Sequence, residues 1–181
     1  MGKNIVIFAG NDVGSLKPKY YLNLAYQTGK LLGKAGFTVV TGGGPGLMNE
    51  ASKGACEAGG QTVGVCLEIS GRKQSVYLKE KYFYRKLNNR QKKLISLGQA
   101  FIALPGGIGT YYEIMEILAL KRKKEIPLDY PLILVSEYFR IFHRLMQEIA
   151  NEGFASKEID LFYKLVRNPE DAVGEILKYR L

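Results

Sequence analysis

An apolar run joins a glycine-rich turn in residues 100–110, which read Ala100-Phe101-Ile102-Ala103-Leu104-Pro105-Gly106-Gly107-Ile108-Gly109-Thr110. The run over 100–104 has the continuous apolar character of a strand that is buried on both faces. The turn over 105–109 leads directly into a helical pattern over 110–124. A strand that ends in glycines and opens a helix is typical of parallel sheets in α/β proteins.

The same order of strand, turn and helix recurs on both sides of that stretch. We predict further strands over 5–9, 37–41, 62–67 and 132–135. Helical patterns cover 16–35, 47–58, 138–151 and 169–179, and another helix opens near Asn88. The segment 71–93 lacks this regularity and is rich in basic and aromatic residues. This alternation predicts a parallel sheet with crossover helices in one α/β domain over 1–181.

Two glycine-rich turns, 42–46 and 105–109, each follow a predicted strand and open a helix. A helix N-terminus offers unpaired N–H groups and partial positive charge, and it therefore favours phosphate. Neither the GxGxxG nor the GxxxxGK[ST] pattern is present, so dinucleotide or P-loop ATP binding is not supported. The turns could be structural only, but their repetition after separate strands favours a binding site for a phosphate-bearing small molecule.

The net charge of +9 is concentrated in one segment. Between Arg72 and Lys93 there are nine basic residues and one acidic residue, a local net charge of +8. Such a segment can attract a phosphorylated small molecule, or it can be a solvated surface. Aromatic residues among the cations also suit single-stranded nucleic acid. No nucleic-acid-binding motif is present, so we do not expect nucleic acid as the partner.

Several classes of protein are disfavoured by what the sequence lacks. His143 is the single histidine, which leaves no set for a zinc site or a histidine-based nucleophile, and we expect a structural or solvated role for it. No apolar run approaches the ~20 residues that cross a bilayer, and we expect no membrane association. The two cysteines lack metal-ligand spacing, and the start shows no signal-peptide pattern; we therefore expect a cytoplasmic location.

Two charged residues are candidates for chemistry near the second glycine turn. Glu113 falls on the first turn of the helix after that turn, where a carboxylate lies close to any bound ligand, although it could equally serve the helix dipole. Glu116 lies one turn further along the same face. Arg90 lies in the helix that precedes the strand over 100–104, and it could clamp a phosphate, orient Glu113 or remain solvated.

These residues together resemble a known family. The run Gly42-Gly43-Gly44-Pro45-Gly46-Leu47-Met48, the later Gly59-Gly60, and Pro105-Gly106-Gly107-Ile108-Gly109-Thr110 followed by Glu113 are similar to the LOG family. Its members are cytokinin-activating phosphoribohydrolases that were long labelled lysine decarboxylases. The resemblance covers about residues 5–153. It implies a Rossmann-like, doubly wound parallel sheet with helices on both faces, and a homodimer.

The resemblance also implies an activity: hydrolysis of the N-glycosidic bond of a nucleoside 5′-monophosphate, AMP or an N6-substituted AMP, to a free base and ribose 5-phosphate. Glu113 and Arg90 would be the catalytic residues, and no metal or cofactor is expected. The residues implied to bind substrate and phosphate are Gly10, Asn11, Gly42, Gly43, Gly44, Gly46, Met48, Asn49, Pro105, Gly106, Gly107, Gly109, Thr110 and Glu116.

The chain departs from the family pattern at several positions. Gln91 follows Arg90 where the family usually has lysine, and Asn11-Asp12 replaces a pair of serines. Asn49 and Tyr112 also differ from the usual residues. The preferred base is therefore not defined by the resemblance. The alternative is a non-catalytic carrier on the same fold, for a nucleotide or a molybdenum-cofactor-type ligand.

Overall fold

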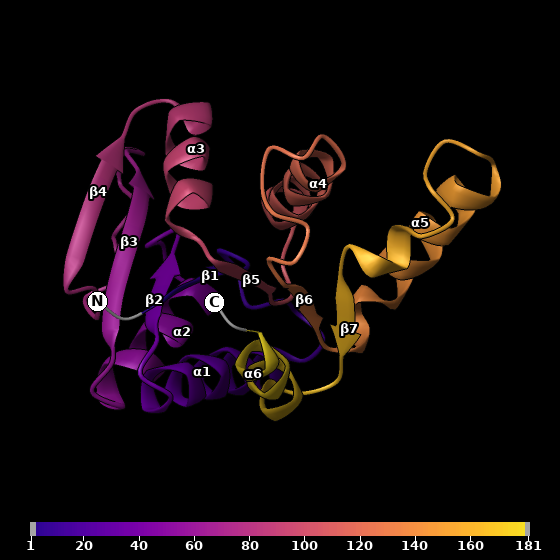
Figure 1. The fold of residues 1–181 in the computed structure, drawn as a ribbon. Coiled ribbons are helices and arrows are strands. Elements are labelled where there is room, and N and C mark those ends of the chain that lie inside the picture. Colours follow the sequence, from indigo (N-terminus) through magenta and orange to yellow (C-terminus); the bar gives the residue numbers. More distant parts are fainter. Residues whose placement is uncertain (1–2, 180–181) are drawn as a thin grey trace.

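Seven parallel strands form the centre of the structure, a computed structural model that describes residues 3–179 (Figure 1). Their order across the sheet is β4-β3-β2-β1-β5-β6-β7. The strands are β1 (Asn4–Phe8), β2 (Thr38–Thr41), β3 (Gln61–Leu67), β4 (Glu80–Tyr84), β5 (Ala100–Ala103), β6 (Leu132–Val135) and β7 (Lys164–Val166).

Helices cover both faces of this sheet, which confirms the predicted Rossmann-like, doubly wound fold (Figure 1). One face carries α1 (Pro18–Lys34), α2 (Leu47–Glu57) and α6 (Pro169–Lys178), and the other carries α3 (Leu87–Leu97), α4 (Ile108–Arg122) and α5 (Arg140–Asn151). Short 3₁₀ helices lie at Glu137–Phe139 and Ile159–Leu161. No helix within residues 3–179 combines the length and apolar character required to cross a membrane.

Strand β1 shows why two cores form. Ile5 and Ile7 belong to the apolar cluster under α1, α2 and α6, whereas Val6 and Phe8 belong to the cluster under α3, α4 and α5. Successive side chains of a strand point to opposite faces, so an uninterrupted apolar run fits a sheet that is covered on both sides.

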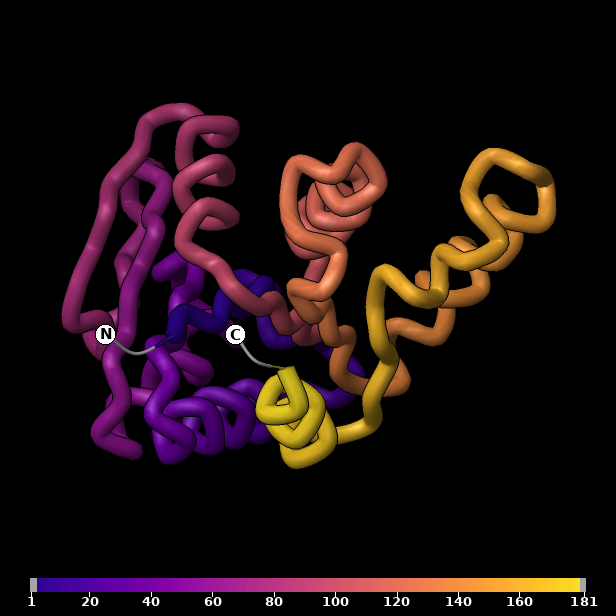
Figure 2. Tube along the Cα trace, in the orientation of Figure 1, coloured from indigo at the N-terminus to yellow at the C-terminus, as the bar shows by residue number. Residues whose placement is uncertain are grey.

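The order of strands reverses beside β1. The chain builds from β1 out to β4 and then returns to add β5, β6 and β7 on the other side of β1. Figure 2 shows this as an indigo strand between a magenta half and an orange-to-yellow half. In open parallel sheets, ligands bind at the carboxyl ends of the strands where the order reverses. The loops after β1 and β5 are therefore expected to form the site.

Two strands were missing from the sequence-based prediction, which recognised five. β4 lies within the segment 71–93 that looked irregular, and it pairs in parallel with β3 at the edge of the sheet. Only its Tyr82 and Tyr84 are partly buried against the core, so its apolar signal is weak. β7 has three residues and forms the other edge, which is too short for a periodic pattern.

A lysine is buried at the end of α4. Lys121 is only 2% exposed, and its Nζ donates a 2.9 Å hydrogen bond to the carbonyl oxygen of Phe162. Burial lowers the pKa of Lys121 from 10.5 to about 8, and the charge of Asp129 opposes this shift only in part. The folded protein therefore holds this ammonium group in an environment that disfavours its charge.

Candidate active site

A cavity of about 320 Å³ opens at the point where the strand order reverses. The loops after β1 and β2 and the first turns of α3 and α4 line it. The predicted residues that it brings together are Gly10, Asn11, Gly42, Met48, Arg90, Gly107, Gly109, Thr110 and Glu113. Residues that line it without having been named as candidates include Asp12, Leu67, Arg72, Leu87 and Ile108, of which Arg72 and Leu87 come from the basic segment between Arg72 and Lys93.

Arg90 and Glu113 form an ion pair inside this cavity. Nη1 of Arg90 donates a 2.7 Å hydrogen bond to Oε1 of Glu113, and both side chains are 10% exposed. Arg90 comes from the first turn of α3. Glu113 comes from the second turn of α4 rather than the first, because that helix begins at Ile108 and not at Thr110 as predicted. Along the chain α3 precedes β5 and α4 follows it, and both helices cover the same face of the sheet.

The guanidinium group of Arg90 is held on several sides. Its Nε donates to the carbonyl oxygen of Val65 on β3 at 2.9 Å, and Nη1 also donates to Oε1 of Gln91 at 3.0 Å. Nη2 lies against Gly42, where a Cβ atom would overlap it. Glycine at position 42 is therefore required for this close approach of arginine and loop.

Burial raises the pKa of the Glu113 carboxyl group, and the positive charge and hydrogen bond of Arg90 oppose that shift. The nearby carboxylate of Glu116 raises the pKa further. Carboxylates whose pKa is raised in a cleft are typical of catalytic sites. The arrangement can hold a negative charge next to a reacting centre and can also exchange a proton.

The N-terminus of α4 faces the same cavity. Its N-cap residue, Gly107, has no side chain to bind the first N–H groups of the helix. Within residues 3–179, the backbone N–H groups of Ile108 and Gly109 have no hydrogen-bond acceptor. The N–H of Thr110 bonds to the carbonyl oxygen of Gly107. Free N–H groups at a helix N-terminus are suited to phosphate oxygens.

Arg72 brings a second cation to the cavity. It lies on the loop between β3 and β4, and its Nη2 donates to Oδ1 of Asn11 in the loop after β1. Among the described residues it has no ion-pair partner. Arg90 is paired with Glu113, whereas Arg72 has no carboxylate within ion-pair distance among the described residues, although Asp12 lines the same cavity.

The other predicted site residues lie around the cavity rather than on its wall. Pro105 and Gly106 line a neighbouring cavity of about 260 Å³, together with Tyr138, whose hydroxyl donates to the carbonyl oxygen of Gly106 at 2.5 Å. The carbonyl oxygen of Gly43 accepts from the N–H of Ser75, which joins the loop after β2 to the loop between β3 and β4.

The remaining four have local roles at α2 and α4. Gly46 precedes α2 with φ of +67°, a conformation that favours glycine, and Gly44 lies beside Met48. Nδ2 of Asn49 donates to Glu50 at 3.2 Å. Oε2 of Glu116 is buried without a hydrogen-bond partner among the described residues. A direct role in ligand binding for these residues remains a prediction.

His143 lies on α5, outside the cavity lining, and its Nδ1 is 2.8 Å from the hydroxyl oxygen of Tyr163. In the part of the chain that the structure describes, no group of three or more His, Cys, Asp or Glu side chains could hold a metal ion. The charged residues that line the cavity are thus Arg90, Glu113, Arg72 and Asp12, and among them Arg90 and Glu113 form the buried ion pair.

The fold and this cavity define a Rossmann-like protein with a buried arginine–carboxylate pair beside the N-terminus of a helix. The family described as "Possible lysine decarboxylase" matches residues 35–176. A cytokinin riboside 5′-monophosphate phosphoribohydrolase of Rhodococcoides fascians is 30% identical over 96% of this chain and 89% of its own length. A probable enzyme of the same name from Oryza sativa subsp. japonica is 27% identical over 98% and 73%. The chain therefore belongs to the LOG family.

Solved structures share the fold. The molybdenum cofactor binding protein of Rippkaea orientalis has a TM-score of 0.74 at 23% identity, over 98% of this chain and 97% of its own. The molybdenum cofactor carrier protein of Chlamydomonas reinhardtii has a TM-score of 0.69 at 20% identity, over 98% of each chain. The same architecture thus occurs in proteins named for binding as well as in relatives named for hydrolysis.

Proposed function

We propose that this protein hydrolyses the N-glycosidic bond of a nucleoside 5′-monophosphate, AMP or an N6-substituted AMP, to a free base and ribose 5-phosphate. The observation that carries the proposal is the buried pair of Arg90 and Glu113 beside the uncapped N-terminus of α4. Relatives at 27–30% identity are named phosphoribohydrolases of a nucleoside 5′-monophosphate, which supports the same reaction. The reaction requires no metal or cofactor.

In this proposal the 5′-phosphate binds to the free N–H groups of Ile108 and Gly109. Arg72 faces the same space and provides the positive charge that a phosphate dianion requires. The glycine residues Gly42 and Gly107 leave room for the ribose to approach the backbone. Binding energy from the non-reacting phosphate then positions the sugar against Glu113.

Cleavage of the bond between the base and C1′ creates positive charge on the ribose ring. The Glu113 carboxylate stabilises this oxocarbenium-like state and orients a water molecule, whose oxygen adds to C1′. One proton of the water ends on the departing base, so the products are the neutral base and ribose 5-phosphate. Arg90 favours the ionised form of Glu113 and holds the carboxylate in place, since it donates a hydrogen bond to Oε1.

The test is incubation of the purified protein with AMP and with an N6-substituted AMP, followed by chromatography for free base and ribose 5-phosphate. We expect both products in equal amounts, and we expect Glu113→Gln to abolish release while it leaves the circular dichroism spectrum unchanged. Near-normal turnover by E113Q would remove Glu113 from the mechanism. Tight nucleotide binding without release would instead support a carrier.

We also propose that the protein is a homodimer. The helix α4 is apolar on two sides: Ile114, Ile117 and Leu118 pack in the core, and a second row faces solvent. In that row Ile108 is 91% exposed, Tyr112 42% and Met115 43%. Exposed apolar residues at helical spacing are typical of an interface, and a second copy would bury the same row in a symmetric contact.

We also propose a cytoplasmic location, because neither cysteine forms a disulfide bond in the part of the chain that the structure describes. Cys56 and Cys66 are free thiols, and Cys66 is fully buried. Free thiols of this kind fit a reducing compartment, where nucleotide substrates are also available. Fractionation of cells that produce the tagged protein tests this assignment, and recovery with an oxidising compartment would contradict it.

A further inference from the structure

Gln91 lies beside the catalytic pair and is fully buried. It follows Arg90 on α3 and has 0% exposure. Its Oε1 accepts a 3.0 Å hydrogen bond from Nη1 of Arg90, while its Nε2 has no partner among the described residues. A buried amide that leaves its donor unsatisfied is unfavourable, so the contact of its oxygen with Arg90 is the one interaction that explains its place.

The hydrogen bonds of Arg90 show what Gln91 contributes. A guanidinium group has five N–H donors, one on Nε and two on each Nη. Nε donates to the carbonyl oxygen of Val65, and Nη1 donates to both Gln91 and Glu113. Both donors of Nη2 have no acceptor among residues 3–179, and Nη2 lies next to Gly42 in the cavity. Because protein acceptors occupy Nε and Nη1, Nη2 is the nitrogen left to contact a ligand.

We propose that Gln91 is a positioning residue, whose amide oxygen fixes the guanidinium group so that Nη1 stays on Glu113 and Nη2 faces the substrate. The inference rests on the proposed hydrolysis and extends it to a residue that does not line the cavity. Without this acceptor, Nη1 has one partner instead of two, and the planar group is free to tilt away from Glu113.

Gln91 provides an acceptor for Arg90 without adding a charge next to Arg90 and Glu113. The groups that act on the Glu113 carboxyl are Arg90 from α3 and Glu116 from the same helix as Glu113. A lysine at position 91 could not accept a hydrogen bond from Arg90 and would add a second cation beside it. With glutamine, Arg90 alone offsets the effect of burial and of Glu116 on the pKa of Glu113.

The experiment compares Gln91→Met, which keeps the volume but has no acceptor, with Gln91→Glu, which keeps an acceptor. Gln99→Met is the matched control, because Gln99 Oε1 accepts from the N–H of Asn4, away from the cavity. For Q91M we expect a loss of kcat of about tenfold or more, in line with a lost hydrogen bond to a charged group, with KM changed less than about twofold.

The pH dependence separates positioning from a merely structural role. In Q91M the acid limb of kcat moves to higher pH, because a loosened Arg90 opposes the effect of burial on Glu113 less well. Q91E should recover kcat at pH values above the acid limb, although its negative charge also moves that limb to higher pH. Q99M leaves kcat and the limb unchanged. Wild-type kcat and an unmoved limb in Q91M would overturn the inference.

A readout without turnover separates this inference from the proposed function. Nitrogen-15 NMR of labelled arginine reports how freely the guanidinium group of Arg90 rotates. We expect restricted rotation in the wild type and in Q91E and faster rotation in Q91M. If no nucleotide is hydrolysed, the proposed function fails, and the NMR result alone decides the role of Gln91. Equal rotation in wild type and Q91M would refute it.

Discussion

Nη1 of Arg90 lies 2.7 Å from Oε1 of Glu113, although 23 positions separate the two residues in the chain. The helices α3 and α4, which carry them, cover the same face of the sheet on either side of β5. The pair is buried, so neither charge can be removed without leaving the other uncompensated. Its geometry therefore depends on helix docking, and its charge state depends on pH.

The first prediction concerns that pH dependence. Burial and Glu116 raise the pKa of Glu113 above its ordinary value of 4.5. The reaction needs the ionised carboxylate, so kcat/KM should fall as the pH decreases through this raised pKa. The half-activity point of the acid limb is expected above pH 4.5. Glu116→Gln removes one cause of the increase and should move the limb to lower pH; movement to higher pH would contradict this account.

The second prediction concerns Arg72 and phosphate. Arg72→Ala should raise the KM for AMP by about tenfold or more, the size expected for one charge-assisted hydrogen bond, with a smaller effect on kcat. The measurement is steady-state kinetics with AMP and with adenosine, which lacks the phosphate. Cleavage of adenosine should be weak in the wild type and little changed in R72A.

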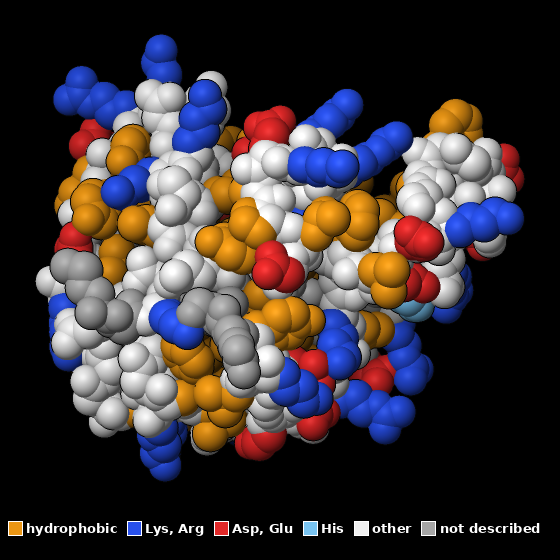
Figure 3. All heavy atoms as spheres, in the orientation of Figure 1, with side chains coloured by type: hydrophobic (Ala, Val, Ile, Leu, Met, Phe, Trp, Pro, Cys, Tyr) orange, Lys and Arg blue, Asp and Glu red, His pale blue; other side chains and the backbone are white. Residues whose placement is uncertain are grey.

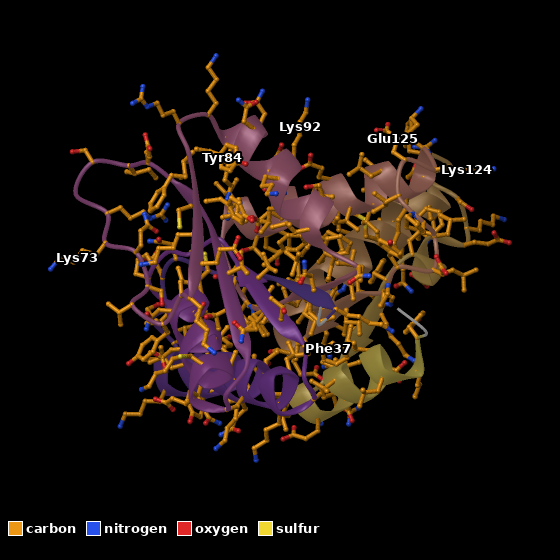
Figure 4. The ribbon with its side chains drawn as sticks, turned by 60° about the vertical axis from the view of Figure 1, so that its left-hand side comes forward. Phe37, Lys73, Tyr84, Lys92, Lys124 and Glu125 are labelled. Atoms are coloured by element: carbon orange, nitrogen blue, oxygen red, sulfur yellow. The ribbon has the colours of Figure 1, made fainter. Side chains whose placement is uncertain are left out.

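Lys73→Ala is the control for Arg72, because it removes the same charge from the next residue. Lys73 is exposed, and in Figure 4 it points away from the body of the protein. Figure 3 shows other Lys and Arg side chains along the upper edge over α3 and α4, so the general field survives either change. Equal loss in K73A and R72A would show that only long-range charge is involved.

The third prediction concerns the stability contributed by Lys121. Its pKa falls from 10.5 to about 8 on folding, so between these values the unfolded chain binds more protons than the folded chain. Its contribution to the free energy of unfolding must then rise as pH increases from about 8 to about 10.5. We expect the wild type to gain on the order of 2 kcal/mol over Lys121→Met across this range.

Urea denaturation at several pH values measures that difference. The quantity of interest is the free energy of unfolding of the wild type minus that of the variant, because contributions that the two proteins share cancel in this difference. The exposed neighbour Lys123 provides a control, and Lys123→Met should run parallel to the wild type. A constant difference between the wild type and K121M would show that Lys121 is not desolvated in the folded state.

The fourth prediction concerns the oligomeric state. Sedimentation velocity should give a particle of twice the mass of one chain. Tyr112→Glu combined with Met115→Glu places charge on the exposed row of α4 and should yield the monomer at micromolar concentration. Leu177→Glu changes an exposed leucine on α6 and should remain dimeric. A monomeric wild type would refute the proposed homodimer.

Much of the fold could be predicted because its strands are buried on both faces. Ala100–Ala103 and Leu132–Val135 read as continuous apolar runs, and the glycine turns mark where strands pass into helices. The edges could not be predicted in this way. β4 begins with the charged Glu80 and Lys81 and buries none of its residues fully, and pairing with β3 rather than composition makes this segment a strand.

Site residues that are close in sequence could be predicted, whereas those brought together by loops distant in sequence could not. Gly107, Thr110 and Glu113 are contiguous with a recognisable turn, so their grouping could be predicted locally. Arg72 could not, because its contact with Asn11 joins loops 61 positions apart and depends on how the loop after β3 folds back. Likewise, nothing in the spacing of α3 indicates that the side chain of Gln91 turns toward Arg90 rather than toward solvent.

The contacts of Arg90 also bear on the order in which the protein folds and becomes active. Its side chain joins α3 to the carbonyl oxygen of Val65 on β3 and to Glu113 on α4. Three elements must dock before these bonds can coexist, so the site forms only when the sheet has assembled on both sides of β1. During refolding, helical signal should return before the capacity to act on substrate. The recovery of activity should therefore report when the last of these elements has docked.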